Sequence, residues 1–235
     1  MKSFAGRVAA ITGAGSGMGR ALAHSLASQD CHLALCDVNT VNLDQAASEI
    51  DNDRIRVTTH RVDVANRTEM EKFAADVVKA HGKVNMIFNN AGVSLTDTVE
   101  HMSYEDFEWL MGINFWGVVH GTKAFLPYLR LVDEAHIINT SSIFGTISVA
   151  TQSAYNASKF AVRGFTLALK VELEDTPIGV SCVQPGGVKT NIVKESRYVP
   201  LDNNAPTKDE FIDTFENLAQ LTASEAAKHI LKGVK

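Results

Sequence analysis

Two side chains capable of proton chemistry lie four residues apart in the segment SAYNASKF, at 153–160. Tyr155 supplies a phenol and Lys159 an ammonium group, and this spacing places both on one face of a helix. A free phenol has a pKa of about 10 and is a poor base at pH 7, whereas a nearby ammonium favours its ionised form. The pair could exchange a proton with an alcohol or ketone. It could equally be a surface tyrosine packed along a lysine stem.

A glycine-rich turn near the N-terminus has the composition of a phosphate site. The segment TGAGSGMGR, at 12–20, follows an apolar run and opens an amphipathic stretch. Backbone amides at a helix start, together with the helix dipole, favour a pyrophosphate. The spacing T-G-x-x-x-G-x-G departs from the G-x-G-x-x-G fingerprint, and a tight strand-to-helix connection would have the same composition. We expect dinucleotide contacts here from Thr12, Gly13, Gly15, Ser16, Gly17, Met18 and Gly19.

An acid follows at the distance expected for ribose recognition. Asp37 closes the apolar run HLALCD and lies 24 residues after Gly13, where such folds place a carboxylate to bind the adenosine ribose hydroxyls. It could instead cap a helix, although Asn39 and Thr40 are better placed to do so. A carboxylate here repels the 2′-phosphate of NADP, and the next two residues supply no compensating cation. We therefore expect NAD as the cofactor.

The elements that would position these residues alternate between short apolar runs and amphipathic stretches. We expect strands at 7–12, 32–37, 60–64, 84–90, 136–142 and 179–184, and helices at 17–29, 41–50, 67–81, 104–130, 153–174 and 224–233. Strands separated by helices imply right-handed crossovers and a parallel sheet covered on both faces. The prediction is a single α/β domain over residues 1–235.

Composition favours a globular protein that acts on small molecules. The 235 residues are 45% hydrophobic, and a net charge of -5 leaves no basic surface for nucleic acid. No apolar run approaches the roughly 18 residues of a membrane span, and the start has too short a run for a signal peptide. The histidines show no metal-ligand pairing, so no metal is expected. A cytoplasmic protein with reduced thiols is indicated by the odd set of Cys31, Cys36 and Cys182.

Five motifs occur in the order of the short-chain dehydrogenase/reductase family, which the chain resembles from Gly6 to Thr190. They are TGAGSGMG at 12–19, NNAG at 89–92, SS at 141–142, YNASK at 155–159 and PGGVKT at 185–190. Each motif is common alone, whereas the ordered set is highly specific. The resemblance implies a doubly wound, mostly parallel Rossmann-like sheet, in agreement with the alternation of strands and helices. It also implies an oxidoreductase acting on CH–OH groups.

Within this resemblance, four side chains correspond to the catalytic positions. Tyr155 would be the general acid/base, and Lys159 its activator and a ligand of the nicotinamide ribose. Ser142 would bind the substrate oxygen, and Asn114 would support Lys159 through water. Ser142 is chosen because it lies 13 residues before Tyr155, which leaves Ser141 as a packing or backbone-bonding residue. Besides Tyr155 and Lys159, the implied cofactor contacts are Asp63, Val64, Asn90, Ala91, Gly92, Pro185, Gly186, Val188 and Thr190.

The expected function is therefore an NAD-dependent oxidoreductase that moves a hydride between nicotinamide and an alcohol or ketone carbon. An NADP-linked carbonyl reductase is the alternative that would use the same four catalytic residues with NADP in place of NAD. A catalytically silent NAD-sensing module would need only the glycine turn and Asp37. Each catalytic candidate also has a structural alternative, because Asn114 could bend a buried helix, Ser142 form a turn and Lys159 extend into solvent.

Two segments bear on the substrate. The stretch IFGTISVATQ, at 143–152, carries apolar residues and no Arg or Lys, which favours an apolar, uncharged alcohol or ketone. These side chains could instead pack internally; they are Ile143, Phe144, Ile147 and Val149. Residues 191–222 are polar and punctuated by proline, and an insertion of this length predicts a substrate lid.

Assembly and the sheet edge complete the expectations. The helices at 104–130 and 153–174 carry more bulky apolar residues than one sheet face needs, so we expect a homodimer or homotetramer unless all of them are core. These residues are Trp109, Met111, Phe115, Trp116, Phe160, Phe165 and Leu169. The family's seventh strand usually follows the last helix, but the sequence stops at HILKGVK, so an open sheet edge is expected.

Overall fold

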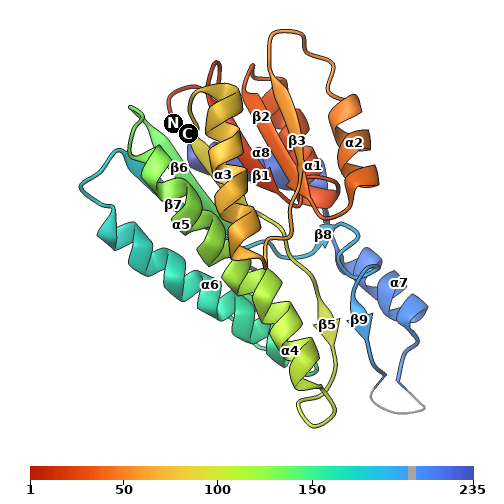
Figure 1. Ribbon diagram of the computed structural model, residues 1–235. Coiled ribbons are helices and arrows are strands. Elements are labelled where there is room, and N and C mark those ends of the chain that lie inside the picture. The colour runs from red at the N-terminus through yellow and green to blue at the C-terminus, as the bar shows by residue number, and fades with distance from the viewer. Residues whose placement is uncertain (201–204) are drawn as a thin grey trace.

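Six parallel strands form the central sheet, in the order β3-β2-β1-β4-β6-β7 (Figure 1). The computed structural model describes residues 1–200 and 205–235. Neighbouring strands pair in parallel throughout, so the expected α/β sheet is confirmed. The chain winds outward from β1 on one side and from β4 on the other. The strands are β1 (Val8–Thr12), β2 (His32–Asp37), β3 (Val57–Arg61), β4 (Met86–Asn89), β6 (Ala135–Thr140) and β7 (Ile178–Val183).

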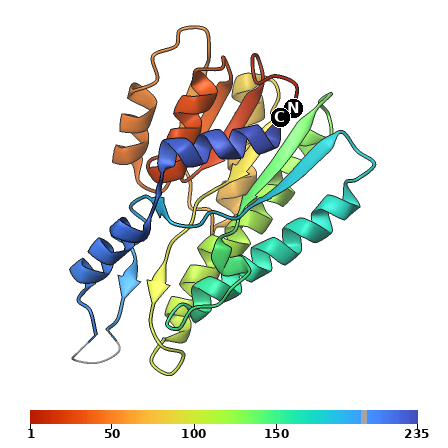
Figure 2. The ribbon, with the colours of Figure 1, turned by 180° about the vertical axis from the view of Figure 1, so that it is seen from behind.

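Helices cover both faces of this sheet, as the two opposite views show (Figures 1 and 2). The helices on one face are α3 (Arg67–His81), α5 (Gly117–Leu129) and α6 (Ser153–Glu172). Those on the other face are α1 (Gly17–Ala27), α2 (Thr40–Ser48) and α8 (Ala223–Val234). The doubly wound arrangement implied by the sequence is therefore present.

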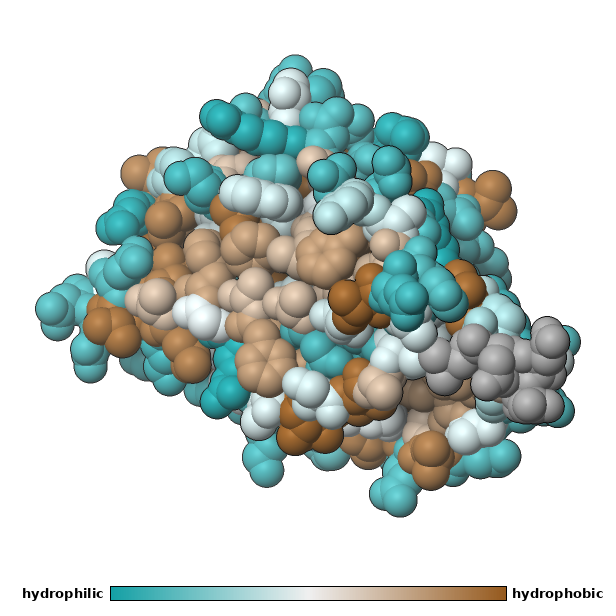
Figure 3. Space-filling view, turned by 90° about the horizontal axis from the view of Figure 1, so that it is seen from below, coloured by the Kyte–Doolittle hydropathy of each residue, from teal (hydrophilic) through white to brown (hydrophobic). Residues whose placement is uncertain are grey.

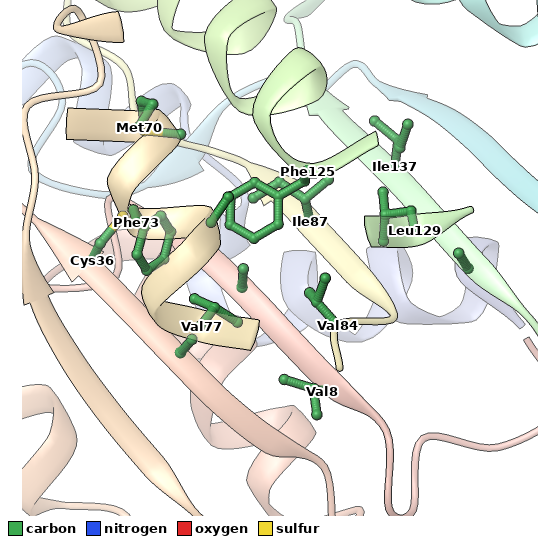
Figure 4. Packing of buried hydrophobic residues seen from close by; sticks show 14 of the residues in the cluster. Val8, Cys36, Met70, Phe73, Val77, Val84, Ile87, Phe125, Leu129 and Ile137 are labelled. Carbon is green, nitrogen blue, oxygen red and sulfur yellow. The ribbon is translucent and has the colours of Figure 1, made fainter. Parts of the chain in front are cut away.

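The core between the sheet and α3 and α5 contains aromatic and branched side chains (Figure 4). Phe73 and Phe125 meet edge to face with ring centroids 5.4 Å apart, and Val8 and Ile87 of the sheet belong to the same cluster. Truncating a buried phenylalanine of this kind costs about 3–5 kcal/mol. Because helices cover both faces, β1 is buried along its whole length and its burial does not alternate.

Residues 104–130 are helical as expected, but the helix is interrupted. α4 (Tyr104–Met111) and α5 are joined by a π-helical turn at Gly112–Trp116. Such turns widen a helix and are frequent at functional sites. Asn114 lies in this turn, fully buried, with its side chain bonded to the backbone of Val93. The helix thus departs from α geometry at a candidate functional residue.

One boundary prediction, that of the third strand, was wrong. The strand expected at 60–64 is β3 at Val57–Arg61, because its pairing with β2 starts at Leu33↔Val57. The expected lid contains regular elements, although its residues 201–204 lie outside the described residues. A capping box of Thr207 and Glu210 begins its helix, α7. The short elements concerned are β5 (Leu95–Thr96) paired with β9 (Arg197–Tyr198), β8 (Val188–Lys189) paired with β10 (Leu221–Thr222), and α7 (Lys208–Leu218).

The sheet has β3 and β7 at its two edges. Within the described residues no strand follows α8. No helix in residues 1–200 and 205–235 is long and apolar enough to cross a membrane.

A buried histidine links the stability of this fold to pH. His136 of β6 is 9% exposed, and its ring occupies the space where a side chain on Gly179 would lie. Its Nε2 bonds to the Ser181 hydroxyl at 2.8 Å. Burial lowers the pKa of His136 from 6.5 to about 4, because the charged imidazolium is poorly solvated there.

We expect acid to destabilise the protein through His136. The unfolded chain binds a proton near pH 6.5 and the folded chain only near pH 4, so stability is complete above this window and falls as pH decreases through it. The slope contributed by one such group is at most about 1.4 kcal/mol per pH unit. Urea unfolding across the window should show a shallower slope for His136→Gln, whereas the exposed His101→Gln should match the parent protein. Equal slopes in all three proteins would exclude His136 as the cause.

Candidate active site

A cleft of about 340 Å³ opens where the sheet order reverses, beside the carboxyl ends of β1, β2 and β4. Open α/β sheets bind ligands at this position. The Thr12 hydroxyl links the end of β1 to the turn after β4, because it accepts from the backbone N–H groups of Asn90 and Ala91 at 3.0 Å each. Gly13 has φ +63, and a Cβ on it would lie 2.9 Å from the Ala91 Cα. The glycine therefore allows the two turns to meet.

The start of α1 faces this cleft with free polar groups. Ser16 is the N-cap, but its side chain makes no capping hydrogen bond, and Ser16, Gly17 and Met18 all line the cleft. Gly17 has φ +50, a conformation that glycine adopts without strain. The first-turn amides and the positive end of the helix dipole suit an anionic group, such as a pyrophosphate.

Asp37 lies on the other wall, at the end of β2. Its carboxylate accepts from the backbone N–H groups of Gly15 and Asn39, each at 2.9 Å. Asn39 caps α2 by accepting from Asn42, so Asp37 is not the cap. The cleft lining includes three carboxylates, and no Lys or Arg lines it in the part of the chain that the structure describes. The nearby Arg20 instead pairs with Glu49.

Tyr155 and Lys159 lie one turn apart on α6, as the spacing predicted. The Lys159 ammonium is buried, donates to the Thr140 carbonyl at 3.0 Å, and lies 5.5 Å from the centroid of the Tyr155 ring. It is therefore not an exposed surface group. A Cβ on Gly92 would lie 3.5 Å from Lys159 Nζ and 3.3 Å from Asn114 Oδ1. Gly92 lines the cleft, whereas Asn114, Ser142, Tyr155 and Lys159 are not among its lining residues. The two side chains therefore lie beside one lining residue at the edge of the cleft.

The pKa values at this pair are set mainly by burial. Burial lowers the pKa of Lys159 to about 8, which leaves the ammonium as the main form at neutral pH. Burial also raises the pKa of Tyr155, and a hydrogen bond with Ser142 lowers it in part. The charge of Lys159, which we expected to lower this pKa, is not among the causes of the shift. The phenol is accordingly protonated at neutral pH, the form required of an acid.

The two neighbouring serines have different partners. The Ser142 hydroxyl accepts from the Phe144 N–H at 3.1 Å and begins a 3₁₀ turn at Ile143–Gly145. The Ser141 hydroxyl donates to the Lys159 carbonyl at 2.7 Å. Ser141 is thus the backbone-bonding residue, as expected.

Asn114 fixes the loop between the cleft and the catalytic helix. Its side chain accepts from the Val93 N–H at 2.8 Å and donates to the Val93 carbonyl at 2.9 Å. It also donates to the Ser158 hydroxyl at 3.3 Å, one residue before Lys159. No direct hydrogen bond joins Asn114 to Lys159 among the described residues, so a link between them would need an intervening molecule.

The other predicted cofactor residues fall into two groups. Asp63, Val64, Asn90, Ala91, Gly92 and Thr190 line the cleft with the residues already named. Pro185, Gly186 and Val188 line a different groove, between β7 and α8. Sequence reasoning missed several lining residues that carry no motif, and only their positions at the ends of elements could have indicated them. These residues are Val38, Asn39, Asn42, Val62, Val93, Ile113, Asn191, Ile192 and Glu195.

The side chains of residues 143–149, which lie beside Tyr155, are largely apolar. The Phe144 ring meets the Tyr155 ring edge to face, with centroids 6.2 Å apart. Ile143, Ile147 and Val149 are 40%, 50% and 43% exposed, so they do not pack internally. In residues 1–200 and 205–235, no group of His, Cys, Asp or Glu side chains is arranged to hold a metal ion.

The open parallel sheet, the helix start that suits an anion, and the tyrosine beside a buried lysine define a Rossmann-like nucleotide-binding oxidoreductase. The family model for short chain dehydrogenases matches residues 7–199. The chain therefore belongs to the short-chain dehydrogenase/reductase family.

Individual relatives agree with this assignment. A putative oxidoreductase, SadH of Mycobacterium tuberculosis, is 44% identical over 236 residues, covering 100% of this chain and 84% of the relative. A short-chain dehydrogenase/reductase from Burkholderia phymatum in complex with NAD superposes with a TM-score of 0.90 at 34% identity, over 100% of this chain and 87% of the other. An alcohol dehydrogenase from Thermococcus sibiricus complexed with 5-hydroxy-NADP gives 0.81 at 26% identity, over 95% and 88%. Structures similar to this chain thus include complexes with both types of dinucleotide.

The glycine turn provides a direct test of the cleft. A Cβ on Gly19 would lie 2.0 Å from the Gly13 carbonyl oxygen and 2.8 Å from Asn90 Nδ2. We expect Gly19→Ala to destabilise the protein by about 1–3 kcal/mol through overpacking, with weaker dinucleotide binding. Gly164 of α6 has nothing within 4 Å of its Cβ position, so Gly164→Ala should stabilise by up to about 1 kcal/mol. Urea unfolding measures both effects, and a neutral Gly19→Ala would contradict the close packing of this turn.

Proposed function

We propose that this protein is an NAD-dependent oxidoreductase that interconverts an apolar, uncharged alcohol and the corresponding ketone. The observation that carries the proposal is the buried Lys159 ammonium, which lies 5.5 Å from the centroid of the Tyr155 ring and beside Gly92, a lining residue of the nucleotide cleft. A pure binding module would need only the glycine turn and Asp37. The buried ammonium, which is costly to desolvate, has no purpose in such a module.

The residues of the cleft fit a nicotinamide dinucleotide. The open first turn of α1 suits the pyrophosphate, and Asp37 suits two ribose hydroxyls. When bound, the nicotinamide supplies the hydride chemistry. Gly92 leaves space beside Lys159 Nζ and Asn114 Oδ1, where the lysine would bind the nicotinamide ribose. Pro185, Gly186, Val188 and Thr190 are proposed as contacts on the nicotinamide side.

The chain's own residues would handle the proton. In reduction, the protonated Tyr155 donates to the carbonyl oxygen, and the Ser142 hydroxyl holds that oxygen. In oxidation the phenolate must accept the alcohol proton, so the raised pKa of Tyr155 has to be offset by positive charge close to the phenol. Lys159 supplies such charge from one turn away, held in place by the Thr140 carbonyl.

Charge in the cleft favours NAD over NADP. Asp37, Asp63 and Glu195 line it, with no cationic lining residue in the described parts of the chain. Arg20, the nearest base in the glycine turn, is already paired with Glu49. A 2′-phosphate would therefore meet carboxylates without a partner cation.

We further propose a homo-oligomer in the cytoplasm. Trp116, Phe160, Leu167 and Val171 are 51%, 41%, 48% and 71% exposed along the π turn and α6, although Leu169 is buried. Figure 3, seen from below, shows a broad apolar area on the side where Figure 1 draws α4 and α6. A second copy covering this face would give a dimer or tetramer. Light scattering should show at least twice the monomer mass, and Val171→Glu should reduce this mass.

The proposed cytoplasmic location rests on the three cysteines, whose thiols are all free, as is usual in a reducing compartment.

The chemistry is tested by three substitutions, assayed on secondary alcohols with NAD. Tyr155→Phe should lower kcat by at least about a thousandfold while NADH affinity, followed by fluorescence, stays within about twofold. Lys159→Ala should damage both quantities, because the ammonium is assigned to both the phenol and the ribose. Ser142→Ala should act mainly on kcat. Near-parental turnover by Tyr155→Phe would refute the assignment of the acid/base.

Cofactor preference is tested at Asp37. We expect kcat/KM with NAD to exceed that with NADP by at least about a hundredfold, equivalent to about 2.7 kcal/mol. Asp37→Ala should narrow this gap. Asp63→Ala should change it less, because the family resemblance implies that Asp63 binds the adenine and not the ribose. Comparable kcat/KM for both cofactors in the unmodified protein would favour the NADP-linked reductase instead.

A further inference from the structure

Asn156 follows Tyr155 directly on α6, yet its side chain serves a different segment. It is 6% exposed. Nδ2 donates to the carbonyl oxygens of Phe144 and Ile147, each at 2.8 Å, and Oδ1 accepts from the Val149 N–H at 3.2 Å. Both amide hydrogens and the amide oxygen of the side chain are thus used on one stretch of backbone.

That stretch, residues 144–149, connects the Ser142 turn to the catalytic helix. At its start the Phe144 ring packs against Tyr155. Further along it presents Ile147 and Val149, which are half exposed. The segment therefore forms an apolar wall beside the acid/base, and the position of its backbone determines how much room the wall leaves.

The two halves of the wall are held differently. The first half is closed by its own turn, because the Gly145 N–H donates to the Ser142 carbonyl at 2.8 Å and Ile143 donates to Pro185 at 2.9 Å. For residues 147–149 the additional ties to α6 are the two bonds of Asn156 and the Gln152 N–H on the Val149 carbonyl at 3.3 Å. Loss of the Asn156 amide would leave these part-buried backbone groups without that partner, and the segment would be held to α6 less firmly.

We propose that Asn156 is a positioning residue that sets the substrate size range by fixing residues 144–149 as a wall beside Tyr155. The proposal rests on the proposed function. Asn156 touches neither the reacting atoms nor the nucleotide cleft. Asn156 therefore affects how well the apolar part of the alcohol fits beside the wall, and it does not affect cofactor binding.

The first test needs no substrate. Hydrogen–deuterium exchange of the peptide covering residues 144–149 is compared in the parent protein, Asn156→Ala and Asn156→Asp. Both variants should exchange at least about fivefold faster there: alanine lacks all three bonds, and aspartate turns an oxygen toward two carbonyls. Gln184→Ala is the matched control, because Gln184 contacts the same segment only through the Thr146 hydroxyl. Unchanged exchange in both Asn156 variants overturns the proposal.

The second test uses a series of secondary alcohols of increasing size, with NAD. In the Asn156 variants the ratio of kcat/KM between the largest and smallest substrates should change by about tenfold, chiefly through KM. NADH affinity and the smallest substrate's kcat should stay within about twofold, as in Gln184→Ala. If hydrogen exchange at residues 144–149 becomes faster but the ratio of kcat/KM between large and small alcohols does not change, Asn156 does not set the substrate size range. Failure of the parent protein to oxidise any alcohol refutes the proposed function, whereas the exchange result still decides whether Asn156 holds the wall.

Discussion

The site depends on keeping one ammonium group buried without a carboxylate beside it. Lys159 has no ion-pair partner among the described residues, and its charge is met by the Thr140 carbonyl and the Tyr155 ring. A buried cation held by neutral groups is costly, which is why burial lowers its pKa to about 8. Contacts between α6 and the end of β6 hold the ammonium in this position. The Ser141 hydroxyl donates to the Lys159 carbonyl. Gly145 leaves room for that hydroxyl, because a Cβ on Gly145 would lie 2.4 Å from it.

A buried polar layer aligns the strands that lead to this point. Asn89 of β4 and Asn139 of β6 are opposite in register and share a hydrogen bond of 2.8 Å. Asn89 extends to Thr122 of α5, and Asn139 to Thr166 of α6. Hydrogen-bonded polar networks inside a core specify one arrangement more sharply than apolar packing does, although Asn89 Oδ1 has no hydrogen-bond partner among the described residues. The layer therefore holds α5 and α6 at one register beside the sheet, so that the π turn with Asn114 and the helix with Lys159 are presented together.

The nucleotide cleft and the proposed wall beside Tyr155 are built by different means. Glycines at the turn let β1, β4 and α1 approach closely, so the cleft depends on residues that have no side chain. The wall beside Tyr155 depends on a side chain that is present, the amide of Asn156. On the far side, β5 pairs with β9 of the expected lid, and Arg197 stacks 3.7 Å from the Trp109 ring centroid on α4. The lid strand is thus held by β5 and α4, whereas the wall is held by α6.

Residue patterns alone predicted the alternating strands and helices, the glycine turn, the position of Asp37 and the types of the four catalytic candidates. These features follow from local rules, since apolar period and residue spacing act within one element. The same patterns could not predict the π turn, the start of β3, the elements inside the expected lid or the hydrogen bonds of Asn156. Each of these is decided by partners that are distant in the chain or outside the residue's own element, such as Val93 for Asn114 and β2 for β3. The raised pKa of Tyr155 belongs to the same class, because burial by surrounding elements, and not the spacing to Lys159, controls it.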